Sequence, residues 1–99
     1  MVTFHPNVDQ DFDRIYDFLR EKRQLDEAEA HATILSIYED AEHAGSPPVG
    51  RFKGLTFHRG RNGYFIWFVS NDEEVQVFAV YHRREGYDEV IHERASLAV

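Results

Sequence analysis

The spacing of apolar residues changes from helical to strand-like near the middle of this chain of 99 residues. Before Pro47-Pro48, apolar side chains recur every three or four positions, as they do on the buried face of an α-helix. From Leu55 onward, apolar and polar residues alternate, which is typical of half-buried β-strands. A helical half followed by a strand half, in a chain this short, predicts a single α+β domain over residues 1–99.

Two helices are expected in the first half, after a short strand at Val2–His5 that ends at Pro6. Asn7 is expected to cap the first helix, because a glutamine follows three residues later in a capping-box arrangement. Asp26 has a glutamate at the matching position and is expected to cap the second helix, which should end near Ala44-Gly45. Since only about three residues join the helices, they should lie antiparallel as a hairpin.

Three strands are expected in the second half as an antiparallel meander, followed by a short C-terminal helix from Tyr87. Asn62-Gly63 is expected to form a two-residue type I′ turn, which would place Arg59 opposite Ile66. A second turn is expected at residues 71–73. We therefore expect an N-terminal strand and an antiparallel helical hairpin packed on an antiparallel sheet of about three to four strands.

This register predicts two different faces for the sheet. The face toward the helical hairpin would include Leu55, Phe57, Ala79 and Tyr81. The opposite face would hold an aromatic and polar set of side chains: Thr56, His58, Phe65, Trp67, Val69, Gln76, Phe78, Val80, His82 and Arg84. Because this second face is too aromatic to lie open to water, we expect it to be a groove for a partner or for the C-terminal segment.

The composition excludes several classes of site. The chain has no cysteine, which excludes disulfides, thiolate zinc sites and thiol nucleophiles. Its six histidines show neither an i, i+4 pair nor an HExxH pattern, so we expect no metal site and no cofactor. No apolar run approaches the ~18 residues of a membrane span, and the first residues lack the basic and apolar regions of a signal peptide. We therefore expect a cytoplasmic protein without a membrane partner.

The formal net charge is −7 at pH 7, and all of it lies in the first half of the chain. Residues 1–50 carry four basic and eleven acidic groups, whereas residues 51–99 carry seven of each. A chain this acidic is not expected to bind nucleic acid tightly without specificity. The acidic residues of the first helix are expected to form a solvated face.

Three segments carry a resemblance to a known family: TFHPNVDQDFDRIYDFL at residues 3–19, GYFIWFVSNDEEVQVFAV at 63–80 and VYHRREGYDEVI at 80–91. Together with the order of the expected elements, they resemble the RelE/ParE superfamily of type II toxins over essentially the whole chain. In that family the last strand ends in an apolar run followed by His and Arg, as Val80-Tyr81-His82-Arg83-Arg84 does here. The resemblance implies a toxin that a cognate antitoxin neutralises.

The two branches of the family differ in their targets. RelE-type members cleave mRNA in the ribosomal A site, whereas ParE-type members inhibit DNA gyrase. The RelE branch usually has an arginine where this chain has Phe65, and it has lysines near the positions of Thr56 and His58. Phosphodiester cleavage needs cations and proton-transfer groups at the phosphate, so these departures favour a ParE-like gyrase inhibitor over an mRNA endonuclease. A binding domain that only shares the fold is a third possibility.

The candidate site residues follow from these alternatives. If the protein is a nuclease, the catalytic candidates are His58, His82, Arg84 and Tyr87. The residues expected to contact an antitoxin are Phe65, Trp67, Phe78, His82, Arg83 and Arg84, because aromatic and arginine side chains dominate interface energetics. The aromatic residues could instead stack RNA bases, or the chain's own tail could cover them with Val90 and Ile91 packed inward.

Overall fold

The structure is a computed structural model that describes residues 2–44, 49–52, 55–70 and 74–96. Its elements are, in chain order, β1 (Val2–Phe4), α1 (Val8–Glu21), α2 (Glu27–Glu42), β2 (Val49–Phe52), β3 (Leu55–Arg59), β4 (Tyr64–Ser70), β5 (Val75–His82) and α3 (Asp88–Ala95). The five strands form one sheet in the order β1-β5-β4-β3-β2, in which β1 is parallel to β5 and the other pairs are antiparallel. The α+β class is therefore confirmed, with the N-terminal strand at one edge of the sheet.

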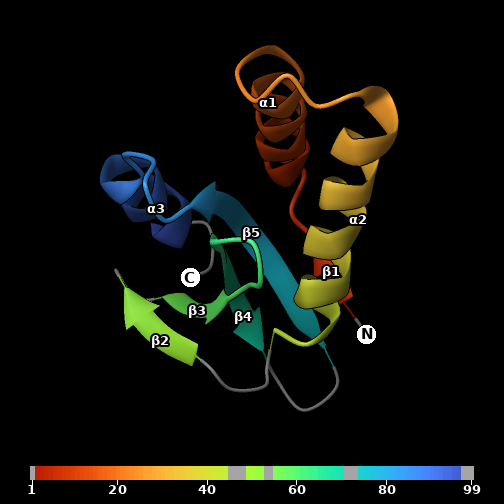
Figure 1. Ribbon diagram of the computed structural model, residues 1–99. Coiled ribbons are helices and arrows are strands. Elements are labelled where there is room, and N and C mark those ends of the chain that lie inside the picture. The colour runs from red at the N-terminus through yellow and green to blue at the C-terminus, as the bar shows by residue number, and fades with distance from the viewer. Residues whose placement is uncertain (1, 45–48, 53–54, 71–73, 97–99) are drawn as a thin grey trace.

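Figure 1 shows α1 and α2 side by side on one side of the sheet and α3 on the other. The sheet therefore separates two apolar clusters. One lies beneath the helical hairpin and includes Val8, Ile37 and Ile66. The other lies beneath α3 and includes Trp67 and Ile91, both fully buried. None of the described helices is long and apolar enough to span a bilayer.

The two helix starts differ from each other in how they are capped. Asp26 caps α2 as predicted, since its Oδ1 accepts a hydrogen bond from the backbone N–H of Glu29 at 2.8 Å. The predicted cap at Asn7 is wrong, because that residue already has helical backbone angles and its side chain makes no capping bond. His5 takes this role instead: its carbonyl accepts from the N–H of Val8 at 2.9 Å, and its Nδ1 accepts from that of Asn7 at 3.2 Å. The expected stop at Gly45 and Pro47-Pro48 lies outside the described residues.

The hairpin between β3 and β4 has a loop of three residues rather than the predicted two. Gly60 N–H donates to the carbonyl of Tyr64 at 2.8 Å, which leaves residues 61–63 between the paired positions. A type I′ turn needs positive φ at both central residues, whereas here Gly63 has φ 82° and Asn62 does not enter that region. The longer loop slips the register by one residue, so Arg59 lies opposite Phe65. In the described part of this hairpin, every β3 side chain is therefore on the other face.

This slip corrects the predicted face of four residues, Leu55, Thr56, Phe57 and His58, and Thr56 now lies opposite Phe68 on the side of the helical hairpin. Phe57 pairs with Trp67 and His58 pairs with Ile66, so Leu55 and Phe57 lie on the α3 side, whereas buried His58 lies on the side of the helical hairpin. The strand β2 was not predicted at all, and it extends the sheet beyond β3. Gly50 of β2 lies opposite Phe57, whose ring occupies the space where a Cβ would be, at 2.7 Å from its Cζ.

A bulge between β4 and β5 reverses the predicted faces of a second set of residues. Phe68 pairs with Val77, but Trp67 pairs with Ala79, so Phe78 is an extra residue in β5. Phe78 and Ala79 therefore both belong to the cluster beneath α3, and every residue after them changes face. Tyr81 joins the α3 side, whereas Val80 and His82 turn to the side of the helical hairpin. The expected turn at residues 71–73 lies outside the described residues.

Candidate functional site

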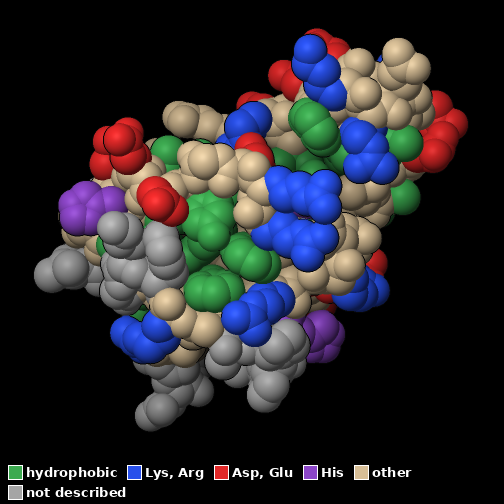
Figure 2. Space-filling model, turned by 60° about the vertical axis from the view of Figure 1, so that its left-hand side comes forward, with side chains coloured by type: hydrophobic (Ala, Val, Ile, Leu, Met, Phe, Trp, Pro, Cys, Tyr) green, Lys and Arg blue, Asp and Glu red, His purple; other side chains and the backbone are tan. Residues whose placement is uncertain are grey.

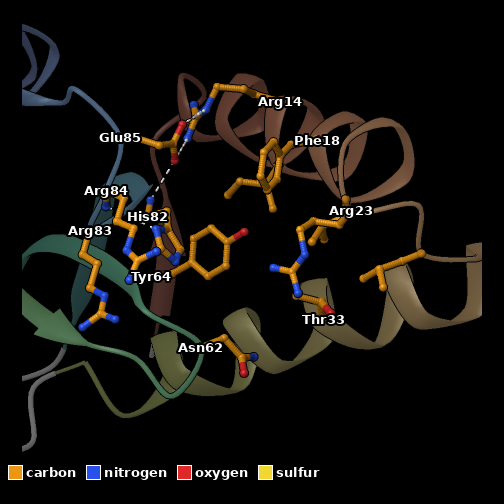
Figure 3. Close-up of a pocket in the computed structure, with 13 residues that line it drawn as sticks. Arg14, Phe18, Arg23, Thr33, Asn62, Tyr64, His82, Arg83, Arg84 and Glu85 are labelled. Carbon is orange, nitrogen blue, oxygen red and sulfur yellow. Dashed lines mark hydrogen bonds and ion pairs between the residues drawn. The ribbon is translucent and has the colours of Figure 1, made fainter.

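A cavity of about 790 Å³ opens between the helical hairpin and the end of β5 that leads into residues 83–85. Figure 3 shows it bounded by α1, by α2 and by the loop between β3 and β4. One wall is apolar and comes mainly from α1 and the segment after it. The residues that line the cavity are Arg14, Ile15, Phe18, Leu19, Arg23, Leu25, Thr33, Asn62, Tyr64, His82, Arg83, Arg84 and Glu85. This lining holds four arginines and one carboxylate in a protein whose net charge is −7.

Arg14 and Glu85 neutralise each other at the upper edge of the cavity. Arg14 Nε donates to Glu85 Oε2 at 2.9 Å, and its Nη2 donates to the carbonyl of Val80 at 2.8 Å. Glu85 Oε1 also accepts the backbone N–H of His82 at 2.7 Å. Burial works to lower the pKa of the Arg14 guanidinium, but the hydrogen bond and charge of Glu85 raise it above its usual value. The Arg14 guanidinium therefore stays charged, and its hydrogen bonds to Glu85 and to the carbonyl of Val80 hold the end of β5 against α1.

Arg23, Arg83 and Arg84 are the remaining cations of the cavity. All three are exposed, and their guanidinium groups form no ion pair or side-chain hydrogen bond with any residue that the structure describes. In Figure 3 the Arg23 guanidinium points toward the hydroxyl of Tyr64, while Arg83 and Arg84 lie on the other side of His82. The cavity thus has two cationic edges with a phenol and an imidazole between them.

His82 and Tyr64 lie against each other between these arginines. Their rings meet edge to face with centroids 5.1 Å apart, and His82 Nδ1 accepts the backbone N–H of Arg84 at 3.2 Å. Burial lowers the pKa of His82; the charge of Glu85 opposes this, and Arg83, Arg84 and Arg23 reinforce it. Burial also raises the pKa of Tyr64. At neutral pH the imidazole is therefore uncharged and the phenol keeps its proton.

The structure divides the residues predicted for catalysis. His82 and Arg84 line the cavity. His58 is buried on β3 opposite Ile66 and does not line it. Tyr87 belongs to the cluster on the α3 side, with its ring 4.9 Å from that of Trp67. The four candidates are therefore not brought together. Among the described residues, no group of three His, Asp or Glu side chains is placed to hold a metal ion.

The residues predicted for partner binding are divided in the same way. His82, Arg83 and Arg84 line the cavity, but Phe65, Trp67 and Phe78 lie on the opposite side of the sheet. Trp67 and Phe78 are buried there, because α3 covers them with Ile91 inward and Val90 packed at the edge. The alternative in which the chain's own tail covers the aromatic face is therefore the arrangement that the structure adopts.

A buried ion pair is the main feature that the sequence interpretation missed. Asp11 is fully buried, which corrects the expectation that the acidic residues of this helix are all solvated. Arg94 Nη2 donates to Asp11 Oδ1 at 2.9 Å, its Nη1 donates to Oδ2, and the backbone N–H of Val80 donates to Oδ2 at 2.9 Å. The available signal was positional: Asp11 lies three residues after Val8 on the buried face of α1. Arg14 and Arg23 of the cavity were likewise not singled out.

Comparison of the sequence with models of protein families and with curated proteins found no match.

Proposed function

We propose that this protein is the toxin of a type II toxin–antitoxin module, a ParE-like growth inhibitor that acts on DNA gyrase and is neutralised by a cognate antitoxin. The observation that carries the proposal is the end of β5, where His82, Arg83 and Arg84 enter a cationic cavity. The resemblance makes this His-Arg ending the functional part of the fold. The order of N-terminal strand, helical hairpin, sheet strands and C-terminal helix, in a mixed five-stranded sheet, supports it further. Such a protein would act in the cytoplasm.

Inhibition by binding suits this cavity better than bond cleavage does. Cleavage of RNA needs a base that takes a proton from the 2′-hydroxyl and an acid that protonates the leaving oxygen. The Nδ1 of His82 is already an acceptor for Arg84, and its Nε2 faces Gly63, where an added Cβ would lie 2.9 Å away. Burial raises the pKa of Tyr64, so the phenol is a poor base. The arginines are thus better suited to hold a target than to cut it.

A ribosome-dependent mRNA endonuclease is the second candidate, and one observation favours it. Three arginines without an ion pair among the described residues, the imidazole of His82 and the phenol of Tyr64 all line one cavity. Arginines placed around a phosphate stabilise the charge that develops during its transfer, and a phenol can donate a proton. This candidate requires His82 to change its hydrogen bonding when RNA binds.

The protein has two candidate surfaces for binding the proposed antitoxin. The cavity edge formed by His82, Arg83 and Arg84 is accessible as it stands. Trp67 and Phe78 would become accessible only if α3 left the sheet, which would also break the pair between Asp11 and Arg94. We therefore propose that the arginine edge is contacted first.

Induced expression in bacteria tests the proposal. Wild-type protein should arrest growth, and purified protein should inhibit DNA supercoiling by gyrase while leaving mRNA on translating ribosomes intact. The double variant Arg83→Ala/Arg84→Ala should restore growth, whereas Arg59→Ala, an exposed arginine outside the cavity, should not. Cleaved mRNA with active gyrase would select the second candidate. Normal growth with abundant folded wild-type protein would refute a toxin of either kind.

A further inference from the structure

The unpaired arginines of the cavity leave a local excess of positive charge. Glu85 is the only carboxylate in the described lining, and both of its oxygens are engaged by Arg14 and the N–H of His82. The positive charges of Arg23, Arg83 and Arg84 therefore lie on both sides of His82 and Tyr64, and no described carboxylate of the lining neutralises them. Figure 2 shows basic side chains close together in the middle of one face, beside exposed hydrophobic side chains. An anion bound between these arginines would remove the repulsion among their positive charges. The acidic residues that the structure describes outside the cavity do not supply this negative charge.

We propose that this cavity binds a nucleotide-sized organic phosphate, with the phosphate between Arg23 and Arg84 and the aromatic body against Phe18. A phosphate monoester carries a charge of about −1.5 to −2 near neutral pH. It therefore neutralises several neighbouring cations more completely than a single carboxylate does. The planar guanidinium fork also fits phosphate oxygens in pairs. Arg83 at the outer rim adds a third positive charge, and the Tyr64 hydroxyl in the cavity provides a neutral donor.

The size and the apolar wall indicate a ligand larger than the phosphate alone. The cavity volume of about 790 Å³ is in the range of pockets that hold drug-sized molecules. Phe18 is 46% exposed at its wall, beside Ile15, Leu19 and Leu25, and an aromatic body would cover it. Asn62 Nδ2 donates to Ser36 Oγ at 3.0 Å, which fixes the amide and leaves its oxygen to accept from an amino group of the ligand.

This inference goes beyond the proposed function, because a phosphate site in the cavity requires neither gyrase nor an antitoxin. The phosphate has two possible sources, a free mononucleotide or a nucleotide within a strand. The chemistry of recognition is the same for both, so they are separated by the probes used.

Calorimetric titration of the full chain tests the site with four probes: AMP, adenosine, inorganic phosphate and a short single-stranded oligonucleotide. AMP should bind, and adenosine should bind at least about tenfold more weakly, since charge-assisted hydrogen bonds to the phosphate are lost. Arg84→Ala and Arg23→Ala should each weaken AMP by about tenfold on the same grounds. Arg59→Ala, which changes an exposed arginine outside the cavity, should leave AMP binding unchanged.

Phe18→Ala separates the two parts of the site, because it should weaken AMP but leave inorganic phosphate unaffected. Circular dichroism on each variant verifies that it is folded. An oligonucleotide that binds more tightly than AMP, with the same dependence on Arg84, would identify a strand as the source; the reverse order would identify a free nucleotide. Equal binding of AMP and adenosine, insensitivity to both arginine variants, or no binding of any phosphate probe would overturn the inference. Growth arrest without phosphate binding would overturn only this inference, and binding without arrest only the proposed function.

Discussion

Replacing Arg94 with methionine should destabilise the protein by about 3 kcal/mol, because it leaves the buried carboxylate of Asp11 without its main partner. Arg94 of α3 reaches Asp11 of α1. It donates twice to Asp11 and once to the carbonyl of Phe78, at 3.1 Å. Methionine has a similar length and keeps much of the packing, so the variant isolates the loss of the guanidinium.

The size of the loss follows from what Asp11 retains. Removing one partner of a buried ion pair costs roughly 3–5 kcal/mol. Asp11 keeps a hydrogen bond from Arg14 at 3.0 Å and one from the N–H of Val80, which places the expected loss at the lower end. For a domain of this size, about 3 kcal/mol corresponds to a decrease of roughly 12–24 °C in Tm. The loss is a large share of the roughly 5–15 kcal/mol that stabilises a native domain.

Urea denaturation followed by circular dichroism measures this loss as a lower midpoint with an unchanged m-value. Arg59→Met serves as the control, since Arg59 is exposed and lies outside both the cavity and the pair. In a double-mutant cycle with Asp11→Leu, the coupling energy between positions 11 and 94 should be at least about 2 kcal/mol. A loss below about 1 kcal/mol for Arg94→Met, or a coupling energy near zero, would show that the pair does not hold α3 in place.

Substitutions at three further positions test the same structure at other points. Gly63→Ala should cost about 1–3 kcal/mol in urea denaturation, because φ is 82° and the new Cβ would lie 2.9 Å from His82 Nε2; a neutral result would refute the left-handed turn. Trp67→Ala should cost about 3–5 kcal/mol as a buried cavity mutation, whereas Trp67→Phe should cost less, since the indole N–H has no hydrogen-bond partner among the described residues. His82 has a lowered pKa, so the unfolded chain binds more protons as the pH falls below about 6.5, and stability should fall with it. His82→Gln should flatten this slope in denaturation curves between about pH 6.5 and 5, and an identical slope would contradict the assignment.

The burial of Trp67 also changes how an antitoxin interface can be tested. Trp67→Ala would unfold or loosen the cluster beneath α3, so weaker antitoxin binding by that variant would not identify a contact. Substitutions of exposed Arg83 and Arg84 avoid this difficulty, because neither side chain is part of a buried cluster. They are therefore the better variants for mapping the partner surface.

The helices and every strand except β2 could be predicted from sequence because their signals are local. Val8, Phe12, Ile15 and Leu19 recur at helical spacing, and all four are buried against the sheet. The aromatic and β-branched run of β4 likewise predicted a strand in the correct place. The pair between Asp11 and Arg94 has no local signal, since its partners are 83 residues apart in the sequence. Only the tertiary fold places one beneath the other.

Two single-residue irregularities that periodicity cannot reveal decide where the candidate histidines lie. The third loop residue in the β3–β4 hairpin moves His58 away from the aromatic face, and the extra residue at Phe78 moves His82 to the side of the helical hairpin. An ideal meander would have put His82 on the same face of the sheet as Trp67, the face that α3 covers, and away from Arg23. Because the bulge turns His82 toward Tyr64, the chain leaves β5 with Arg84 facing the cavity that α1 and α2 border. The candidate site therefore exists because the register departs from the regular alternation at Phe78, and straightening this bulge would remove His82 from the cavity while keeping the same strands.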